Sequence, residues 1–276
     1  MKMKNRQPIV SVIVPTYNAA RTINRVIDNL LGQKIDSLEI VVINDGSTDD
    51  TAKVLDKYHD DKRVVVISQE NAGASAARNT GIQNAHGKYL MFADADDDFA
   101  PNFIATMVNA MTSERAGIAI CGHGGDGVRS LLPDVAGSVK KNLPKHVCSS
   151  ILKNGLLYPT WNKIYLTRIV KEKNIFFDET IGYGEDLIFN LNYLKYIDNI
   201  FYIKEPLYIY IYRPGGLSAK TKSNLHYRYE MLAALRDYLG DNLKKPDVAL
   251  KYQLIRMRWI ISANRMKREQ GRKHHE

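Results

Sequence analysis

Strand-like and helix-like segments alternate through the first half of the chain. Three β-branched, apolar runs each precede a segment with apolar residues at helical spacing, and a fourth run precedes a helix expected to start at Pro101. This alternation predicts an α/β fold, a mostly parallel, doubly wound Rossmann-like sheet flanked by helices. The expected strands are residues 9–14 (stopped by Pro15), 38–43, 63–68 and 88–93.

In such a sheet the loops after parallel strands open on one edge, where ligands bind. The four loops contribute Thr16-Tyr17-Asn18, Asp45, residues 71–79 and Asp94–Asp97. We therefore expect these segments to surround a single crevice. The second of them also contains Ser47, with Asp50 three residues on, which resembles a capping box for the following helix.

Three carboxylates are crowded into Asp94-Ala95-Asp96-Asp97 at the end of the fourth strand. Carboxylates this close raise one another's pKa unless a cation neutralises them, and oxygen ligands suit Mg²⁺ or Mn²⁺. The pattern indicates a metal site, although a solvated acidic turn has the same composition.

Composition excludes several protein classes. With 276 residues, 45% of them hydrophobic and 25% charged, the chain matches an ordinary globular protein. Two cysteines are too few for a disulfide framework, no charged-then-apolar leader precedes the first strand, and no apolar run approaches the ~18 residues of a membrane span. We expect a cytoplasmic protein that is not integral to a membrane.

The net charge of +9 is concentrated at one end, because residues 251–276 hold eight Lys and Arg against two Glu. Such a patch favours an anionic partner, either phospholipid headgroups or nucleic acid. Helices are expected near 187–196, 225–238 and 248–266. The last carries Leu250, Leu254, Met257 and Ile261 on one stripe among basic residues. This helix either lies in an anionic membrane surface or packs on the protein with a solvated basic edge.

The region between the two halves is less regular. Residues 122–145 are rich in Gly, Pro and Lys, which predicts a loop or irregular insertion over the crevice. Residues 208–213 alternate like a half-buried strand.

The motifs in these loops resemble those of family 2 glycosyltransferases with the GT-A fold. The resemblance rests on residues 12–18, 43–49, 71–79 and 94–97, and extends to 161–165 and 184–186. It implies a catalytic domain at 1–215, with a nucleotide-sugar half at about 8–121 and an acceptor half at about 122–215. Residues 216–276 would form a helical, basic extension.

The resemblance implies a metal-dependent, inverting hexosyl- or N-acetylhexosaminyltransferase. It would move one sugar from a UDP-sugar to a hydroxyl of a glycan or lipid-linked glycan in bacterial surface polysaccharide synthesis. Mn²⁺ or Mg²⁺ would be the cofactor. The expected location is the inner face of the cell membrane, with peripheral contact through 248–273. No nucleic acid is expected, and an oligomer is compatible with the sequence.

The donor site follows from the same resemblance. Tyr17 would stack on the uracil and Asp45 would accept its N3–H, while Arg78, and more weakly Arg213, would lie at the diphosphate. Asp96 would be a metal ligand, and Asp94 would face the ribose or the metal as a second ligand. The residues expected around the nucleotide-sugar are Pro15, Thr16, Tyr17, Asn18, Asp45, Asn71, Gly73, Arg78, Asp94, Ala95 and Asp96.

On the acceptor side, Asp186 is the candidate general base. The pair Glu185-Asp186 opens a probable helix, where the dipole favours ionised carboxylates. Glu185 would bind acceptor hydroxyls or orient the base. Trp161 would stack on a sugar face or close the core, and the residues leave both roles open.

Two other functions use similar features. A nucleotidyltransferase would share the sheet and the metal carboxylates, but normally has a Gly-rich basic loop after the first strand, where this chain has Pro15-Thr16-Tyr17-Asn18. A non-catalytic nucleotide or nucleic-acid binding module would rely on the basic tail.

Overall fold

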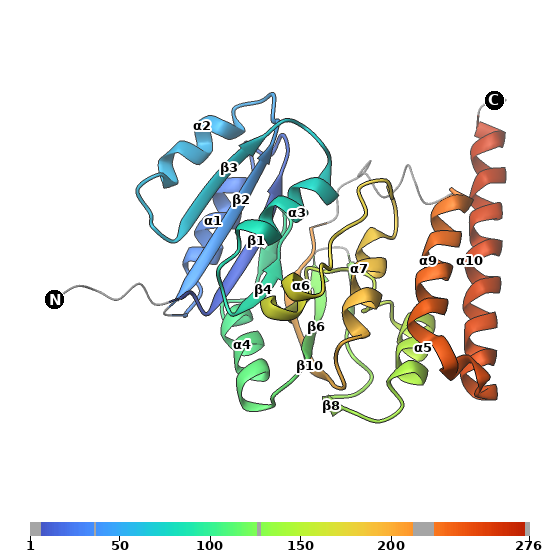
Figure 1. The fold of residues 1–276 in the computed structure, drawn as a ribbon. Coiled ribbons are helices and arrows are strands. Elements are labelled where there is room, and N and C mark those ends of the chain that lie inside the picture. Colours follow the sequence, from blue (N-terminus) through green and yellow to red (C-terminus); the bar gives the residue numbers. More distant parts are fainter. Residues whose placement is uncertain (1–6, 36, 126–127, 212–223, 274–276) are drawn as a thin grey trace.

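The computed structural model describes residues 7–35, 37–125, 128–211 and 224–273. Within them, ten strands form one mixed sheet. Eight of the strands follow the order β3-β2-β1-β4-β9-β6-β10-β5, while β7 pairs with β6 and β8 pairs with β10. Helices cover both faces of the sheet, and α9 and α10 stand beyond one end of it (Figure 1).

The first half of the sheet is parallel, as predicted. It consists of β3 (Val64–Gln69), β2 (Leu38–Asp45), β1 (Val10–Thr16) and β4 (Tyr89–Phe92). Their carboxyl ends therefore share an edge. Pro15 does not end β1 as expected, but pairs with Ile43 inside the strand. A proline lacks only one hydrogen-bond donor, and its φ is compatible with an extended backbone.

The second half of the sheet is mixed. β9 (Lys163–Leu166) is antiparallel to β4 and β6, whereas β6 (Ile118–Gly125) and β10 (Ile200–Ile209) are parallel. The short β5 (Asp98–Phe99) pairs with the end of β10. Because β5 directly follows the acidic turn, this pairing joins the turn to the second half of the sheet.

The prediction of a loop or irregular insertion at residues 122–145 is wrong. This stretch contains the end of β6, then β7 (Val128–Leu131), β8 (Gly137–Val139) and the start of α5. The glycines that suggested a loop allow close approach of strands. A Cβ on Gly122 would lie 2.9 Å from the carbonyl oxygen of Glu205, and one on Gly125 would lie 1.9 Å from that of Tyr210.

Helices follow the strands largely where periodicity predicts them, including the three expected in the second half. Two further ones, α5 and α6, were not predicted. The helices are α1 (Ile23–Leu31), α2 (Thr51–Leu55), α3 (Ala74–Asn84), α4 (Phe103–Ser113), α5 (Leu143–Lys153), α6 (Thr167–Glu172), α7 (Glu185–Leu194), α9 (Leu225–Leu239) and α10 (Pro246–Lys273), with 3₁₀ turns at Asp56–Tyr58 and Gly240–Lys244.

The capping box expected at Ser47 and Asp50 is absent. Helix α2 begins at Thr51, and Asp50 makes no side-chain cap. Instead, Asp49 Oδ1 accepts a hydrogen bond from the Thr51 backbone N–H at 3.0 Å, and Ser47 Oγ accepts one from the Asn18 N–H. Ser47 thus fixes the neighbouring loop rather than the helix.

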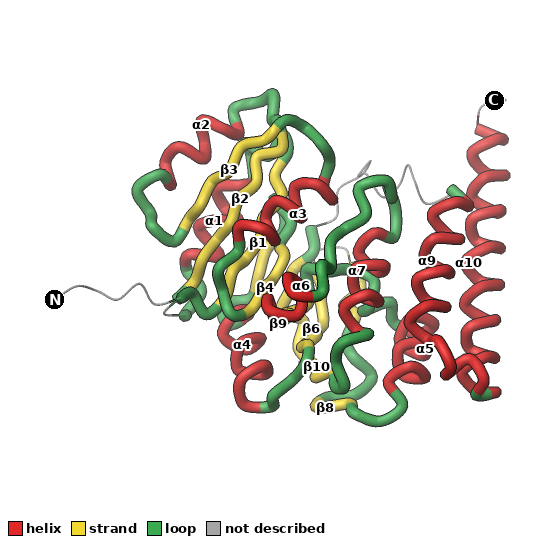
Figure 2. The backbone as a smooth tube through the Cα atoms, viewed as in Figure 1, coloured by secondary structure: helices red, strands yellow, loops and turns green. Residues whose placement is uncertain are grey.

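Two apolar clusters occupy opposite faces of the sheet, because alternate strand residues point to opposite sides. Val12 and Val42 join the cluster under α1 and α4, whereas Ile13 and Val41 join the cluster that includes α3 and α7. In Figure 2 the strands lie between these two helical layers. The parallel strands therefore have both faces buried, as parallel sheets generally do.

The C-terminal helices α9 and α10 contribute to the apolar cluster that includes α3 and α7. Met231 of α9 and Trp259 of α10 share it with Phe189 of α7. Trp259 Nε1 also donates a hydrogen bond to Tyr158 Oη at 2.8 Å. The residues of the predicted extension thus pack against the predicted acceptor half, although the boundary at residue 215 stays a prediction. Within the described chain, no helix is both long and apolar enough to cross a bilayer.

Candidate active site

A cavity of about 510 Å³ lies at the shared edge of the parallel strands. All eleven residues predicted to surround the nucleotide-sugar line it. They are Pro15, Thr16, Tyr17, Asn18, Asp45, Asn71, Gly73, Arg78, Asp94, Ala95 and Asp96. The topology accounts for this grouping, because each segment lies at or after the carboxyl end of a strand in the parallel half.

The loops after β1 and β2 are tied together at this edge. Asn18 Oδ1 accepts a hydrogen bond from the Thr48 N–H at 2.8 Å, and Asn18 itself adopts a left-handed backbone with φ of 49°. Gly46 has φ of 66°, and a Cβ there would lie 2.6 Å from the Asn71 nitrogen. Only glycine fits this contact without strain. Tyr17 stays 52% exposed beside the cavity, so its ring has an open face.

The Asp45 carboxylate forms hydrogen bonds with the loop that leads into α3. Its Oδ1 accepts hydrogen bonds from Gln69 Nε2 at 2.8 Å and the Ala72 N–H at 3.0 Å, and its Oδ2 accepts one from the Gly73 N–H at 2.8 Å. The side chain is almost fully buried. With one donor on Oδ2, the carboxylate still has capacity for another hydrogen bond.

The acidic turn is fixed by Tyr208 of β10. The Tyr208 hydroxyl accepts a hydrogen bond from the Asp94 N–H at 3.1 Å and donates one to Asp97 Oδ2 at 2.8 Å. Asp97 is buried, and its Oδ1 accepts a hydrogen bond from the Ile211 N–H at 2.9 Å. Asp97 therefore holds the turn against β10, whereas Asp94 and Asp96 line the cavity.

Helix α1 supports the turn from the other side. Arg25 forms an ion pair with Asp98 at 2.7 Å and donates a hydrogen bond to the Asp96 carbonyl oxygen at 2.8 Å. Asn29 hydrogen-bonds the other oxygen of Asp98. These contacts hold the backbone of the turn while the Asp96 side chain remains at the cavity.

Burial and neighbouring carboxylates raise the pKa of two acids in the turn. Burial, above all, and the carboxylates of Asp186 and Asp96 raise the pKa of Asp94 to about 6, although Arg78 acts in the opposite direction. Burial and the neighbouring Asp94 raise the pKa of Asp97 to about 7. A bound cation would offset this repulsion.

The donor set fits Mg²⁺ or Mn²⁺ only together with a phosphate ligand. Asp94 and Asp96 offer carboxylate oxygens, which these ions prefer. In the parts of the chain that are described, no group of three or more His, Cys, Asp or Glu side chains could enclose a metal ion. Protein sites for Mg²⁺ often use one or two carboxylates and complete the shell with substrate phosphates and water.

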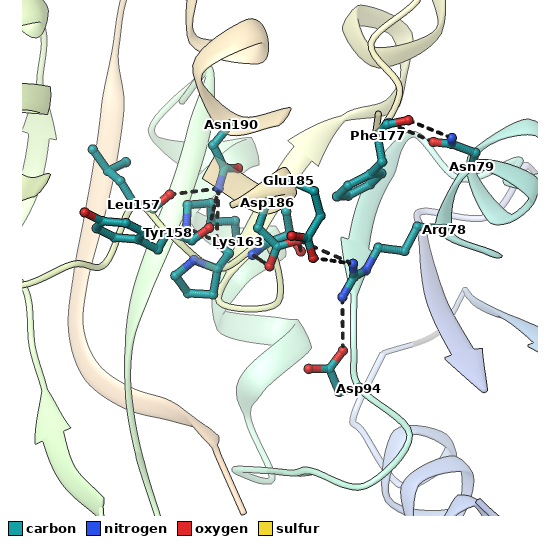
Figure 3. Close-up of polar contacts among 12 residues, drawn as sticks. Arg78, Asn79, Asp94, Leu157, Tyr158, Lys163, Phe177, Glu185, Asp186 and Asn190 are labelled. Carbon is teal, nitrogen blue, oxygen red and sulfur yellow. Dashed lines mark hydrogen bonds and ion pairs between the residues drawn. The ribbon is translucent and has the colours of Figure 1, made fainter. Parts of the chain in front are cut away.

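Arg78 links the two halves of the site (Figure 3). Its Nη2 lies 3.6 Å from Asp94 Oδ1, and its Nη1 lies 3.4 Å from Glu185 Oε1 and 3.5 Å from Asp186 Oδ1. Burial alone would lower the pKa of Arg78, but the three carboxylates raise it. The guanidinium also lies over the Phe177 ring, 5.2 Å from its centroid. Arg78 thus neutralises carboxylates from both halves.

Asp186 and Glu185 both lie in the first turn of α7 and face this arginine. Asp186 Oδ2 lies 3.3 Å from the Thr160 backbone nitrogen and its Oδ1 lies 3.3 Å from Thr160 Oγ1, both as acceptors. Glu185 beside it accepts a hydrogen bond from Arg78 Nη1 at 3.4 Å, and burial together with the Asp186 charge raises the Glu185 pKa. The structure therefore brings the predicted base and the predicted metal ligand to the same arginine.

The loop that carries Thr160 is held by a buried lysine. Lys163 Nζ donates hydrogen bonds to the Leu156 carbonyl oxygen at 2.7 Å, to Asn162 Oδ1 at 2.8 Å and to the Pro159 carbonyl oxygen. Burial lowers the pKa of Lys163 to about 7, and the Asp186 carboxylate opposes this shift. The three oxygen acceptors match the three protons of an ammonium group.

Trp161 is not among the cavity residues. Its ring stacks on Tyr208 at a centroid distance of 4.2 Å and meets the His123 ring edge-on at 4.8 Å. The side chain is only partly buried. These contacts match the core-closing alternative for Trp161, and its role toward an acceptor stays a prediction. Arg213, the other weak donor candidate, lies outside the described residues.

Several residues that hold the site in place were not predicted from the sequence. Arg25 and Thr160 act through contacts with segments distant in the chain, and nothing in their local pattern marks them. Lys163 acts through contacts with residues 156–162, close to it in the chain. Tyr208 could be predicted only as a strand residue packing on the sheet. The Trp-Asn-Lys motif at 161–163 was the one available signal, since it contains the buried lysine.

Comparison with known proteins decides the family. Residues 11–154, over half of the chain, match the family model described as glycosyl transferase family 2. The chain belongs to this family. It is a glycosyltransferase, and the four loop motifs lie inside the matched region.

A curated relative of this family 2 chain supports the assignment. This relative is the glycosyltransferase EpsJ of Bacillus subtilis. The two sequences are 32% identical over 245 residues, which cover 84% of this chain and 71% of EpsJ. The chain spans only 31% and 60% of two further curated glycosyltransferases. The activities of those longer proteins therefore do not transfer directly.

Solved structures confirm the GT-A fold of the family 2 domain. Staphylococcus aureus TarS in complex with UDP superimposes with a TM-score of 0.70 at 22% identity, over 91% of this chain and 70% of the other. A Pyrobaculum calidifontis mannosyltransferase, solved with GDP-Man and Mn²⁺, gives a TM-score of 0.60 at 17% identity, over 94% and 87%.

Proposed function

We propose that this glycosyltransferase moves a single hexose or N-acetylhexosamine, with inversion, from a UDP-sugar to an acceptor hydroxyl. The observation that carries the proposal is the grouping of all eleven expected donor residues around one cavity, next to Asp186 and Glu185. TarS, whose fold is similar, was solved in complex with UDP and with UDP-GlcNAc, which supports the choice of donor.

The nucleotide would lie between the loops after β1 and β2. Tyr17 has an exposed ring for stacking on the uracil, and Asp45 keeps acceptor capacity on Oδ2 for the uracil N3–H. Arg78 would lie at the diphosphate. Its side chain lines the cavity beside Asp94 and Asp96.

Asp94 and Asp96 are the residues that would hold Mn²⁺ or Mg²⁺. When bound, such an ion stabilises the negative charge of a departing diphosphate. The neighbouring contacts serve this arrangement, because Arg25, Tyr208 and Asp97 hold the turn and leave two carboxylates at the cavity. Structures of two GT-A proteins with Mn²⁺ support a divalent ion.

Asp186 is the proposed general base. Its carboxylate would take the proton of the acceptor hydroxyl as that oxygen bonds to the anomeric carbon. The bond from the anomeric carbon to the UDP oxygen breaks in the same displacement, which inverts the configuration. Thr160 Oγ1 hydrogen-bonds the Asp186 carboxylate, and Arg78 Nη1 lies 3.5 Å from it. Glu185 would orient the base or bind other acceptor hydroxyls.

The acceptor class that we propose is a glycan or lipid-linked glycan of a bacterial surface polysaccharide. This part rests on the family resemblance. A lipid-linked acceptor would place the enzyme at the inner face of the cell membrane.

A thermal-shift panel of nucleotide-sugars tests the donor and the metal. UDP-sugars should raise the melting temperature only when Mn²⁺ or Mg²⁺ is present, and Asp96→Ala should abolish the shift. Asp56→Ala is a matched control, since Asp56 is an exposed acid on the turn after α2. Equal stabilisation by UDP-sugars in a metal chelator would contradict metal-dependent donor binding.

The base is tested separately. Asp186→Asn should keep the metal-dependent thermal shift and lose transfer, measured as UDP release from the stabilising donor. Turnover that persists in Asp186→Asn would exclude this residue as the base.

A further inference from the structure

Helix α10 has apolar residues on two opposite faces. One face is buried against α5 and α9, and contains Val248, Ile255, Trp259 and Ala263, each at most 5% exposed. This face joins the helix to the rest of the protein, together with the Trp259 hydrogen bond to Tyr158. The packed arrangement expected as one alternative from the sequence is therefore present.

The opposite face is apolar and uncovered. Leu250, Leu254, Met257 and Ile261 are spaced by four, three and four residues, so they form one stripe. Their exposed fractions are 62%, 45%, 57% and 61%, and Leu250 and Ile261 are the most exposed large hydrophobic residues in the described chain. We call these four residues the α10 stripe. The other large exposed hydrophobics occur singly or in pairs on other elements.

A row of basic residues runs beside the α10 stripe. Lys251, Arg258 and Arg265 are each seven positions apart, and each lies one or four positions after a stripe residue. On a helix this spacing makes a continuous row along one edge. Arg256 is exposed on the other flank. No acidic residue interrupts the segment from 248 to 268.

We propose that the α10 stripe docks on an anionic lipid bilayer, with the helix lying along the surface. The four apolar side chains would enter the headgroup region, and the basic row would contact lipid phosphates. A basic, amphipathic helix of this kind binds interfaces through apolar burial and attraction to anionic lipids. The inference deepens the proposed function by naming a partner surface, but it does not depend on the transfer reaction.

The length and placement of α10 suit this role. Its 28 residues correspond to about 42 Å of helix. It forms the outermost layer of the molecule, and its C-terminal end extends past α9 (Figure 1). Docking through the stripe would leave the buried face and its contacts with α5 and α9 unchanged.

The same stripe is a poor seam for pairing with a second copy. The four-three-four spacing resembles a coiled-coil seam, but the next seam positions are Asn264 and Arg268. A coiled coil normally sustains its seam over three or four heptads. Two antiparallel copies would also bring the basic rows against each other, where like charges repel. Charge complementarity therefore favours an anionic bilayer.

Vesicle co-sedimentation of the full chain, without donor or metal, tests the proposal. Binding should be strong on phosphatidylcholine vesicles that contain phosphatidylglycerol, weak on phosphatidylcholine alone, and reduced by salt. Leu254→Gln with Met257→Gln should lower the partition coefficient about ten-fold or more, because both side chains lose apolar burial. Both positions are exposed, so the fold should persist, which circular dichroism would verify.

Matched variants separate the charge from the apolar contribution. Arg256→Gln with Arg265→Gln should lower binding to the anionic vesicles about five-fold for each charge removed. Lys53→Gln with Lys62→Gln removes two exposed lysines near α2 and β3, and should leave binding unchanged. Val65→Gln is the apolar control, since Val65 is exposed on the edge strand β3.

The alternatives give distinct outcomes. If wild type fails to bind the anionic vesicles, or binds them equally after the stripe substitutions, the proposal is overturned. A concentration-dependent dimer in sedimentation velocity that Met257→Gln abolishes, without vesicle binding, would assign the stripe to a second copy. A protein that binds vesicles but fails the UDP-sugar thermal-shift test would disprove only the proposed function.

Discussion

Arg78 Nη1 lies 3.5 Å from Oδ1 of Asp186, the proposed base. The same guanidinium reaches Asp94 at 3.6 Å, so one side chain from α3 connects the predicted metal-binding turn with the first turn of α7. The arginine is buried. Its charge therefore acts where solvent screening is weak.

Replacing Arg78 with methionine should destabilise the protein strongly. The change would leave three carboxylates around an apolar side chain, and removal of one partner from a buried ion pair costs about 3–5 kcal/mol. Urea unfolding would measure the change in the free energy of unfolding. Arg25→Met removes a half-exposed ion pair with Asp98 and should cost less. A loss below about 1 kcal/mol for Arg78→Met would mean that the cluster contributes little.

Tyr208→Phe should weaken donor binding with little effect on packing. The variant keeps the ring that stacks on Trp161, but loses the hydroxyl between the Asp94 N–H and Asp97. Two hydrogen bonds are lost, each worth about 1 kcal/mol, so the dissociation constant for UDP with Mn²⁺ should rise about five-fold or more. Calorimetric titration measures it. An unchanged constant would show that the turn does not need this bridge.

Asp45→Asn should loosen the loop from residue 71 to 73. The amide nitrogen would replace one carboxylate oxygen, and would therefore place a donor against the N–H of either Ala72 or Gly73. An unsatisfied buried donor costs about 1–3 kcal/mol. We expect lower unfolding free energy and weaker UDP binding. Asp60→Asn, an exposed position, is the control. Full retention of both properties in Asp45→Asn would contradict the assigned contacts.

His123 should make the protein sensitive to acid. Burial lowers its pKa to about 4, from an ordinary value of 6.5, and its Nδ1 has no hydrogen-bond partner among the described residues. The unfolded chain binds a proton between these values and the folded chain does not, so the contribution of His123 to stability is present above pH 6.5 and is lost as pH falls toward 4.

His123→Phe tests this dependence. The aromatic ring keeps the edge-on contact with Trp161 and cannot be protonated. Urea unfolding at pH 7 and pH 4.5 should show a smaller loss of stability in the variant, by about 2 kcal/mol. Equal losses in both proteins would mean that His123 does not titrate differently on folding.

The sequence predicted the parallel half of the sheet because its strands are short, apolar and followed by periodic helices. The same topology argument predicted which loops meet, and the cavity contains residues from each of those loops. Position along the chain was sufficient here, since the carboxyl ends of parallel strands necessarily share an edge.

The second half could not be predicted in the same way. Gly122 and Gly125 suggest a loop by composition, yet they allow contact between β6, β7 and β10. The contacts of Arg78 with Glu185 and Asp186 join residues more than a hundred positions apart, and the sequence alone marks Arg78 only for the diphosphate. The support of Asp186 by Thr160 and Lys163 likewise depends on three-dimensional packing.

The central claim is that Asp94 and Asp96 hold a divalent ion against the diphosphate of a UDP-sugar. Crystals grown with UDP and Mn²⁺, with data collected at the manganese absorption edge, test it most directly. We predict an anomalous peak at these two carboxylates, with UDP in the cavity beside Tyr17 and Asp45. An ion and a nucleotide bound anywhere else would contradict the account.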